Sequence, residues 1–206
     1  MRAEEFAAQE NVSRETLERL KTYEALLRKW TPRINLVSRG TLDDFWSRHI
    51  LDSTQILDLG PDDAREWVDL GTGGGFPGIV IAILAAERNP DLSVTCVESD
   101  VRKATFLRTV LREIGVSASV IAERIEKVEL LSADVVSARA LAPLPRLLEL
   151  AKPHLAPGGV ALFPKGAEHD AELKEALETW SFRADKIPSR THPEAVILRI
   201  GEIKRV

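Results

Sequence analysis

Five glycines lie within the segment Gly71–Gly78, between two apolar runs. Glycine inside a regular element costs roughly 0.5–1 kcal/mol, so such a cluster indicates a tight turn or a close approach of the backbone to a ligand. Within the segment, Gly73, Gly75 and Gly78 satisfy the pattern G-x-G-x-x-G. A glycine turn that serves only packing is the alternative explanation.

Glu98 is the next residue whose position suggests chemistry. It ends the strand predicted after the glycine turn, where a carboxylate can accept hydrogen bonds from both hydroxyls of a ribose. Pro77, a residue suited to the first position of a helix, opens the helix that follows the turn. Strand, turn, helix, strand and acid in this order predict a site for a nucleoside-containing cofactor at the carboxyl ends of the strands.

Asp69 precedes the first glycine and bears on which cofactor is bound. A dinucleotide dehydrogenase needs two mononucleotide-binding halves and a substrate domain, and the chain is too short for both. S-adenosylmethionine carries a carboxylate, which backbone N–H groups at a helix start can bind, and cationic groups that suit acids or carbonyls. Methyl transfer is therefore favoured, although Asp69 could equally serve only to tie down the turn.

Composition and the remaining motifs exclude several classes of protein. The 206 residues, 44% hydrophobic and 29% charged, are typical of a soluble globular protein, and a cytoplasmic monomer without membrane contact is expected. The scattered histidines and the lone Cys96, which we interpret as an inert strand residue, predict no metal site. The formal net charge of −4 argues against DNA and non-specific nucleic-acid binding but leaves room for a local basic patch.

The elements that must position these residues alternate between strands and helices from residue 66 onward. This alternation predicts a parallel sheet with right-handed crossovers. The predicted strands are 67–70, 93–98, 117–121, 134–138, 160–164, 182–187 and 195–200. The predicted helices are 77–87, 100–114, a short one near 126, 144–154 and 168–179. Because no helix separates the last two strands, they should pair antiparallel.

Helices alone are predicted before this region. Ser13 is a plausible N-cap for a first helix that Pro32 ends, and Thr41 is a plausible N-cap for a second helix at 42–57. The chain is therefore predicted to comprise a helical extension (1–60) and one compact methyltransferase domain (61–206). The predicted fold class is α/β, with a seven-stranded, mostly parallel Rossmann-like sheet whose last strand is antiparallel.

Motifs along nearly the whole chain resemble one known family. The loop D-L-G-T-G-G-G-F-P-G-I is similar to D-V-G-T-G-P-G-L-P-G-I of the RsmG (GidB) family, bacterial 16S ribosomal RNA guanine-N7 methyltransferases. Further similar segments are N-L-V-S, R-H-I-L-D-S, E-S-D-V-R-K-A-T-F-L-R, R-I-E, S-A-R-A and K-G, in this order. Gly74 stands where the family often has proline, and the tail S-R-T-H-P-E-A-V-I departs from its relatives.

The resemblance implies a class I methyltransferase that uses S-adenosyl-L-methionine and methylates N7 of a 16S rRNA guanine (the guanine 527 class), within the 30S subunit or an assembly intermediate. It implies that Glu98 meets the ribose, that Ile125 and Glu126 flank the adenine and that Arg139 lies near the methionine end. The full set of predicted cofactor-binding residues is Gly71, Gly73, Gly75, Phe76, Glu98, Ile125, Glu126 and Arg139.

Several of these residues have a purely structural alternative. Arg139 could pair with a carboxylate such as Glu126, and Phe76 could be a core residue at the helix start. His49 and Asp52 could bond to each other, and we favour a structural role for them, closing the pocket from the N-terminal side.

RNA binding requires lysine and arginine contacts to phosphate. The candidates near the expected cofactor face are Arg28, Lys29, Arg33, Arg48, Lys165 and Arg190. A second basic set, Arg102, Lys103, Arg108 and Arg112, recurs along one helix and could equally be ordinary solvated surface.

The chemistry predicted for this site needs no general base. Guanine N7 has an in-plane lone pair that is unprotonated at neutral pH, so catalysis can rest on positioning and no catalytic residue is assigned. Two other functions stay open: a small-molecule methyltransferase, and a non-catalytic nucleotide-binding regulator.

Overall fold

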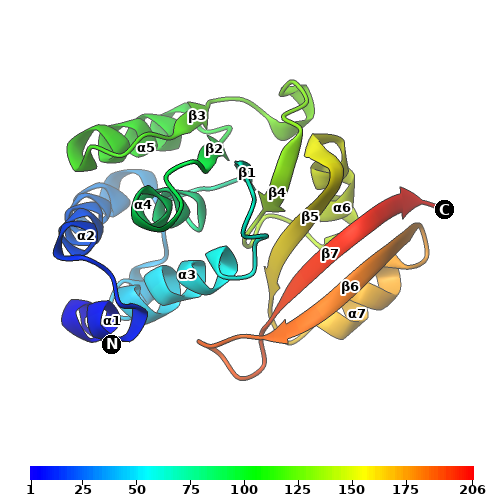
Figure 1. Cartoon of the computed structure of the whole chain (residues 1–206), viewed down its shortest axis with the longest axis horizontal. Helices are drawn as coiled ribbons and strands as arrows, with labels where there is room; N and C mark the ends of the chain where they lie inside the picture. The colour runs from blue at the N-terminus through cyan, green and yellow to red at the C-terminus, as the bar shows by residue number, and fades with distance from the viewer.

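A computed structural model of the chain describes the backbone of residues 1–206 and every side chain except that of Arg39. Its centre is one seven-stranded sheet with the order β3-β2-β1-β4-β5-β7-β6 (Figure 1). The strands are β1 (Glu66–Leu70), β2 (Ser93–Val97), β3 (Ser119–Ile121), β4 (Ala133–Ser137), β5 (Leu155–Lys165), β6 (Trp180–Pro188) and β7 (Val196–Arg205).

The direction of the strands confirms the predicted fold class. Strands β1 to β5 pair in parallel, and β7 runs antiparallel to both of its neighbours, β5 and β6. The chain crosses from β3 at one edge of the sheet to β4, so the strand order reverses between β1 and β4. A reversal of this kind is where open α/β sheets bind ligands, at the carboxyl ends of the strands.

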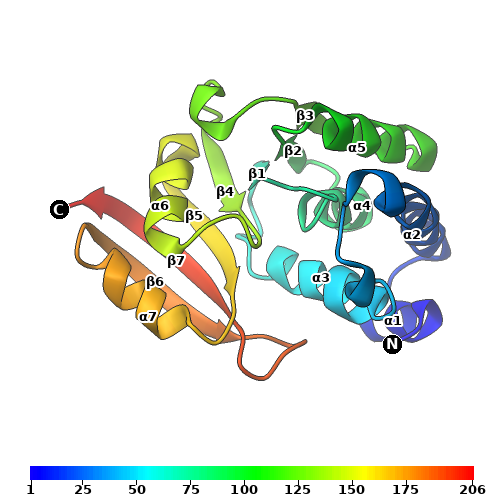
Figure 2. The same cartoon turned by 180° about the vertical axis from the view of Figure 1, so that it is seen from behind.

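Helices cover both faces of the sheet, as the alternating sequence pattern predicts. One face carries α4 (Gly78–Arg88) and α5 (Val101–Ile114), and the other carries α6 (Leu144–Ala151) and α7 (His169–Ala176) (Figures 1 and 2). Short turns of helix, η3 (Ile125–Lys127) and η4 (Lys152–His154), follow β3 and α6. Strand residues contribute alternately to two hydrophobic clusters, Trp67 to one and Val68 to the other, because successive side chains point to opposite faces.

The N-terminal helices differ from the prediction in two places. Helix α1 (Ala3–Glu10) was not predicted, because its pattern offers Phe6 as its one buried residue. Pro32 does not end α2 (Arg14–Ile34), so that prediction was wrong. The proline removes one N–H donor only, and the helix continues until Asn35, whose N–H still bonds to the Thr31 carbonyl at 3.0 Å.

The helix predicted at 42–57 is also wrong in its first half. A 3₁₀ turn, η1 (Arg39–Thr41), is followed by a π-helix, η2 (Trp46–Leu51), which leads into α3 (Asp52–Leu57). Thr41 belongs to the 3₁₀ turn and caps no helix; its hydroxyl instead lies 3.0 Å from His49 Nε2.

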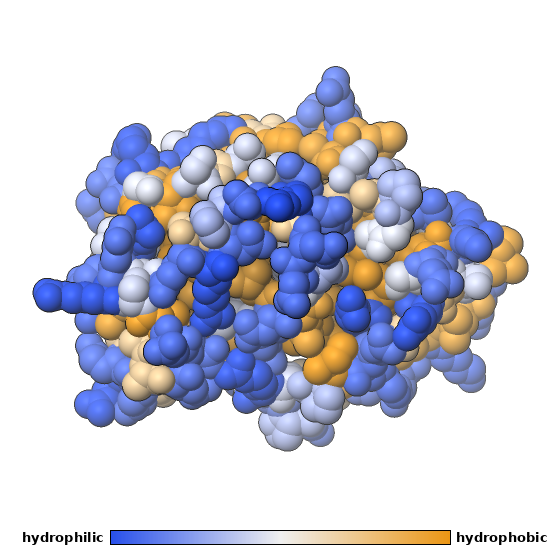
Figure 3. Space-filling view, in the orientation of Figure 1, coloured by the Kyte–Doolittle hydropathy of each residue, from blue (hydrophilic) through white to orange (hydrophobic). Residues whose placement is uncertain are grey.

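The N-terminal helices pack into the same core as the helices of the sheet. Leu20, Tyr23 and Leu27 of α2 are fully buried in one hydrophobic cluster with Ile79 of α4 and Phe106 of α5. The division of the chain near residue 60 stays a prediction. Hydrophilic side chains cover most of the face seen in Figure 3, with hydrophobic atoms between them. Among the described residues, no helix combines the length and the apolar character needed to cross a bilayer.

Candidate functional site

The glycine turn after β1 is held in place by a buried carboxylate. Asp69 is fully buried; its Oδ2 accepts a hydrogen bond from the Gly78 N–H at 2.9 Å, and its Oδ1 accepts one from the Ser137 hydroxyl at 2.8 Å. Burial raises the pKa of Asp69 to about 6, because its effect is larger than that of the hydrogen bonds, which lower the pKa. Asp69 does not line the pocket described below, so the structure supports its role in tying down the turn.

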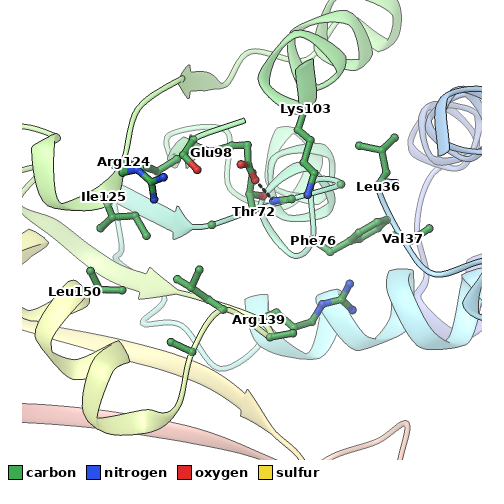
Figure 4. A pocket seen from close by; sticks show the side chains of 18 of the residues that line it. Leu36, Val37, Thr72, Phe76, Glu98, Lys103, Arg124, Ile125, Arg139 and Leu150 are labelled. Carbon is green, nitrogen blue, oxygen red and sulfur yellow. Dashed lines mark hydrogen bonds between the residues drawn. The ribbon is translucent and has the colours of Figure 1, made fainter. Parts of the chain in front are cut away.

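A pocket of about 620 Å³ opens at the carboxyl ends of β1, β2 and β4 (Figure 4). Gly71 and Gly73 form part of its wall, and both have positive φ angles, 64° and 58°, that favour glycine. A Cβ on Gly73 would have no neighbour closer than 3.9 Å, so the backbone there is open to a ligand.

Glu98 lies on the pocket wall as predicted from its place after β2. One carboxylate oxygen accepts from the Gly73 N–H at 2.9 Å and the other from the Asp100 N–H at 2.8 Å. The residue is 8% exposed, and each oxygen retains a further lone pair. These hydrogen bonds fix the carboxylate at the pocket wall, where it can accept further hydrogen bonds from the hydroxyl groups of a ligand.

Apolar and charged side chains share the walls of the pocket, with Arg124 beside Ile125 and Lys103 near Leu36 (Figure 4). Ile125 and Leu150 lie on one side, and Leu36 and Phe76 lie on the other, with Glu98 between them (Figure 4). Of the predicted cofactor-binding residues, Gly71, Gly73, Phe76, Glu98, Ile125, Glu126 and Arg139 line this pocket. Their role in binding stays a prediction.

Gly75 is the predicted residue that does not line the pocket. A Cβ on Gly75 would lie 2.6 Å from the Tyr23 hydroxyl, which itself donates a hydrogen bond of 2.5 Å to the Gly74 carbonyl. Gly75 therefore lies against α2, behind the loop, where no side chain fits.

Arg139, just after β4, is held by the N-terminal helices. Its guanidinium donates to His49 Nδ1 at 2.9 Å and to the Arg48 carbonyl at 3.1 Å, and it lies 3.3 Å from an Asp52 oxygen. The guanidinium carbon is 5.1 Å from the centre of the Phe76 ring, a cation–π distance.

The sequence offered two alternative pairings, Arg139 with Glu126 and His49 with Asp52, and the structure shows neither of them. Arg139 pairs with Asp52, while Glu126 pairs with Arg146. The bonds of His49 and Asp52 run to Arg139 and to other groups, and not to each other. Arg139 lies about 90 positions from these partners in the sequence, so local spacing could not reveal the contact.

These contacts fix the protonation of His49. Arginine has no acceptor, so Nδ1 must carry the lone pair, and Nε2–H then donates to the Thr41 hydroxyl at 3.0 Å. Burial, together with the Arg139 and Arg48 charges, lowers the pKa of His49 to about 3. His49 is thus a neutral acceptor whose lone pair is already used by Arg139.

A second pocket of about 650 Å³ adjoins the first. The two share His49, Arg139 and the segment 140–142, so Arg139 lies in the wall between them. The second pocket is completed by Pro143 before α6, by Pro164 and Lys165 of β5, by Glu172 of α7, and by the loop before β7 together with Val196 at the start of that strand. Sequence reasoning missed this pocket, although the motifs R-H-I-L-D-S, S-A-R-A and K-G each contribute to it.

The predicted RNA-binding residues do not form a single group. Arg48 and Lys165 line the second pocket, and Arg33 lines a small hollow together with Arg102 of α5. Lys29 is exposed on α2. Arg28 bonds to Glu24 and the Leu42 carbonyl, and Arg190 pairs with Glu10 and Asp58, so both already have intramolecular partners.

No cluster of three potential metal-ligating side chains is present in the part of the chain that the structure describes. Cys96 is buried in β2, and burial raises the pKa of its thiol further above the ordinary value.

The sheet order, the reversed β7 and the pocket beside the glycine turn define a class I, Rossmann-like methyltransferase fold. A solved O-methyltransferase from Bacillus cereus in complex with SAH superposes with a TM-score of 0.59 at 16% identity, covering 88% of this chain and 91% of that one.

The sequence matches the family GidB, rRNA small subunit methyltransferase G, over residues 16–195, and the chain belongs to this family. Ribosomal RNA small subunit methyltransferase G of Ruegeria pomeroyi is 54% identical over 95% of this chain and 96% of its own length. The protein of the same name from Cereibacter sphaeroides is 50% identical over the full length of both chains. The chain is accordingly a methyltransferase of small-subunit ribosomal RNA.

Proposed function

We propose that this chain transfers a methyl group from S-adenosyl-L-methionine to N7 of a guanine in 16S ribosomal RNA, the guanine 527 class. The observation that carries the proposal is the pair of adjoining pockets with Arg139 in their common wall. One pocket can receive the methyl donor and the other the acceptor base.

The first pocket fits the donor by its chemistry. The Glu98 carboxylate has lone pairs free for ribose hydroxyls, and Ile125 and Leu150 offer an apolar flank to an adenine. The open backbone at Gly73 would bring main-chain groups close to the amino-acid end. When bound, the donor supplies an electrophilic methyl group on a sulfonium.

The residues of the chain then have to align two reactants. The guanine N7 lone pair forms the new N–C bond while the C–S bond breaks and its electron pair stays on sulfur, so no proton moves in this step. Positioning of this kind can lower a barrier by about 7–11 kcal/mol.

Two titratable side chains near the site, His49 and Asp69, are not free to act as a general base. The His49 Nδ1 lone pair is occupied by Arg139, and Asp69 is buried away from both pockets. Neither side chain is therefore available to accept a proton from a bound base. Arg139 and Phe76 instead hold the wall between the two reactants.

The test is transfer of labelled methyl from S-adenosylmethionine to 30S subunits and to protein-free 16S rRNA, followed by mapping of the methylated base. We expect one modified guanine, and no transfer when that base is replaced by 7-deazaguanine. Methylation of the 7-deaza substrate would refute N7 as the nucleophile.

The same assay separates the two other functions left open by the sequence. Transfer to a small molecule without RNA would indicate a small-molecule methyltransferase. Calorimetric binding of the donor without any transfer would indicate a nucleotide-binding regulator.

A further inference from the structure

A lysine–glutamate pair lies in the wall of the second pocket. Lys165 at the end of β5 and Glu172 on α7 are joined by a bond of 2.6 Å between Nζ and Oε2, and their side chains are 9% and 22% exposed. Taking two charges so far out of water is costly unless both are well partnered. The burial of this ion pair therefore indicates that its position in the pocket wall is specific.

The partners of this pair leave one donor and one acceptor unused. Lys165 Nζ has three hydrogens; one bonds to Glu172 and one to the Ala142 carbonyl at 3.0 Å. Glu172 Oε2 also accepts from the Leu144 N–H at 2.7 Å, while Oε1 has no hydrogen-bond partner among the described residues. A cationic N–H and a carboxylate oxygen thus remain side by side at the pocket.

Between the two purines of RNA, this combination matches the edge of guanine. Guanine presents the O6 acceptor beside the N1–H donor, whereas adenine presents an amino donor beside the N1 acceptor. Enzymes that modify a base commonly read its Watson–Crick edge in a pocket with apolar walls. Pro143, Pro164 and Val196 supply apolar lining here.

We propose that the second pocket selects the target guanine through its Watson–Crick edge, with Lys165 donating to O6 and Glu172 accepting from N1–H. This inference rests on the proposed function. N7 lies on the neighbouring edge, beyond O6, so a base held by O6 and N1–H keeps its N7 lone pair free of the Lys165–Glu172 pair. Because the pocket adjoins the donor pocket at Arg139, the orientation suits attack on the methyl group.

The alternative is that the Lys165–Glu172 pair has only a structural role, because it also holds the loop between β4 and α6 through hydrogen bonds to Ala142 and Leu144. The variant Glu172→Gln separates the two roles. The amide oxygen of Gln should keep the two donors now bound by Oε2, which turns its NH₂ group toward the base. The NH₂ group of Gln is a donor, so it cannot bond to the N1–H donor of guanine, but it can donate to a base whose N1 is unprotonated.

The experiment uses small subunits reconstituted with 16S rRNA that carries guanine, inosine or 2-aminopurine at the target position. All three bases have N7; inosine keeps O6 and N1–H, whereas 2-aminopurine lacks O6 and has an unprotonated N1. For the wild-type enzyme, kcat/KM should be similar for guanine and inosine and about 10- to 100-fold lower for 2-aminopurine.

For Glu172→Gln, kcat/KM should fall about 10- to 100-fold with guanine and should hold or rise with 2-aminopurine. The matched control is Glu175→Gln, which changes an exposed carboxylate of the same helix and should leave every value unchanged. Calorimetry should give the same S-adenosylmethionine affinity for all three proteins.

An equal loss on all bases in Glu172→Gln would assign the pair a structural role and overturn the inference. Equal rates for guanine and 2-aminopurine in the wild type would also overturn it, while leaving methyl transfer to N7 intact. Failure of the proposed function has a different signature, since the wild type would then methylate none of the three substrates.

Discussion

Gly71 and Gly115 form a matched pair for testing how the glycine turn serves the pocket. Both have a φ angle of 64°, so alanine at either position has the same left-handed strain of about 1–2 kcal/mol. They differ in surroundings: a Cβ on Gly71 would lie 2.6 Å from Leu141 Cδ1, whereas a Cβ on Gly115 would meet no atom within 4 Å.

The two variants should therefore separate stability from binding. Gly115→Ala should lower Tm by about 2–8 °C, because a chain of this size loses about 2–4 °C per kcal/mol, and should leave donor affinity unchanged. Gly71→Ala adds an overpacking cost of about 1–3 kcal/mol against Leu141. The clash is relieved by displacement of the Leu141 side chain, which lines both pockets; a donor that must push it back meets this cost, so the affinity for S-adenosylmethionine should be about 5- to 150-fold weaker.

Thermal unfolding and calorimetric titration of S-adenosylmethionine measure the two effects separately. Leu141→Ala placed in the Gly71→Ala background removes the clashing atoms and should restore part of the lost affinity. If Gly71→Ala lowered Tm as Gly115→Ala does but bound the donor as tightly as the wild type, the assignment of this turn to the donor pocket would be refuted.

Three further outcomes are expected. Burial raises the pKa of Asp69 from 3.8 to about 6, so the folded state binds the extra proton and the free energy of unfolding should fall as pH rises through this window. The variant Asp69→Asn places an amide N–H group where the carboxylate accepted a hydrogen bond, so its free energy of unfolding in urea should be about 1–3 kcal/mol lower than that of the wild type. The variant also lacks the pH-dependent term of Asp69. A difference in stability between the two proteins that does not change with pH would contradict the raised pKa. The His49 imidazole should stay neutral at pH 5 with its proton on Nε2, and an NMR titration midpoint near 6.5 would disprove the Arg139 contact. Arg33→Glu should weaken binding to small-subunit RNA and reduce its salt dependence while donor affinity holds; a loss of donor affinity would instead indicate a folding defect.

The sheet and the position of the pocket beside the glycine turn were predictable because their signals are local. Apolar strands alternating with helices specify a parallel sheet, and Glu98 follows its strand wherever that strand is placed. The π-helix at Trp46–Leu51 carried no such signal. His49 and Asp52 project from this helix and the start of α3 toward Arg139, a contact set by tertiary packing between segments about 90 residues apart.

The same distinction applies to the charged side chains. Arg190 and Arg28 looked available for phosphate, but Glu10, Asp58 and Glu24 neutralise them in the folded chain. The pairing of Lys165 with Glu172 could not be read from the motif K-G either, because it requires α7 to pack beside the end of β5. The motif therefore located the lysine but not the carboxylate with which it pairs.

The burial of α2 against α4 and α5 has a consequence for synthesis of the chain on the ribosome. Leu20, Tyr23 and Leu27 emerge early, yet the α5 residues of the same hydrophobic cluster extend to Ile114. At about 5–20 residues per second, the chain needs roughly 4–17 s to extend from Leu27 to the last of those α5 residues. Throughout that interval the apolar face of α2 is exposed in the nascent chain, where chaperones can bind it. Synonymous codon changes that slow the translation of α4 and α5 should prolong the exposure of this face.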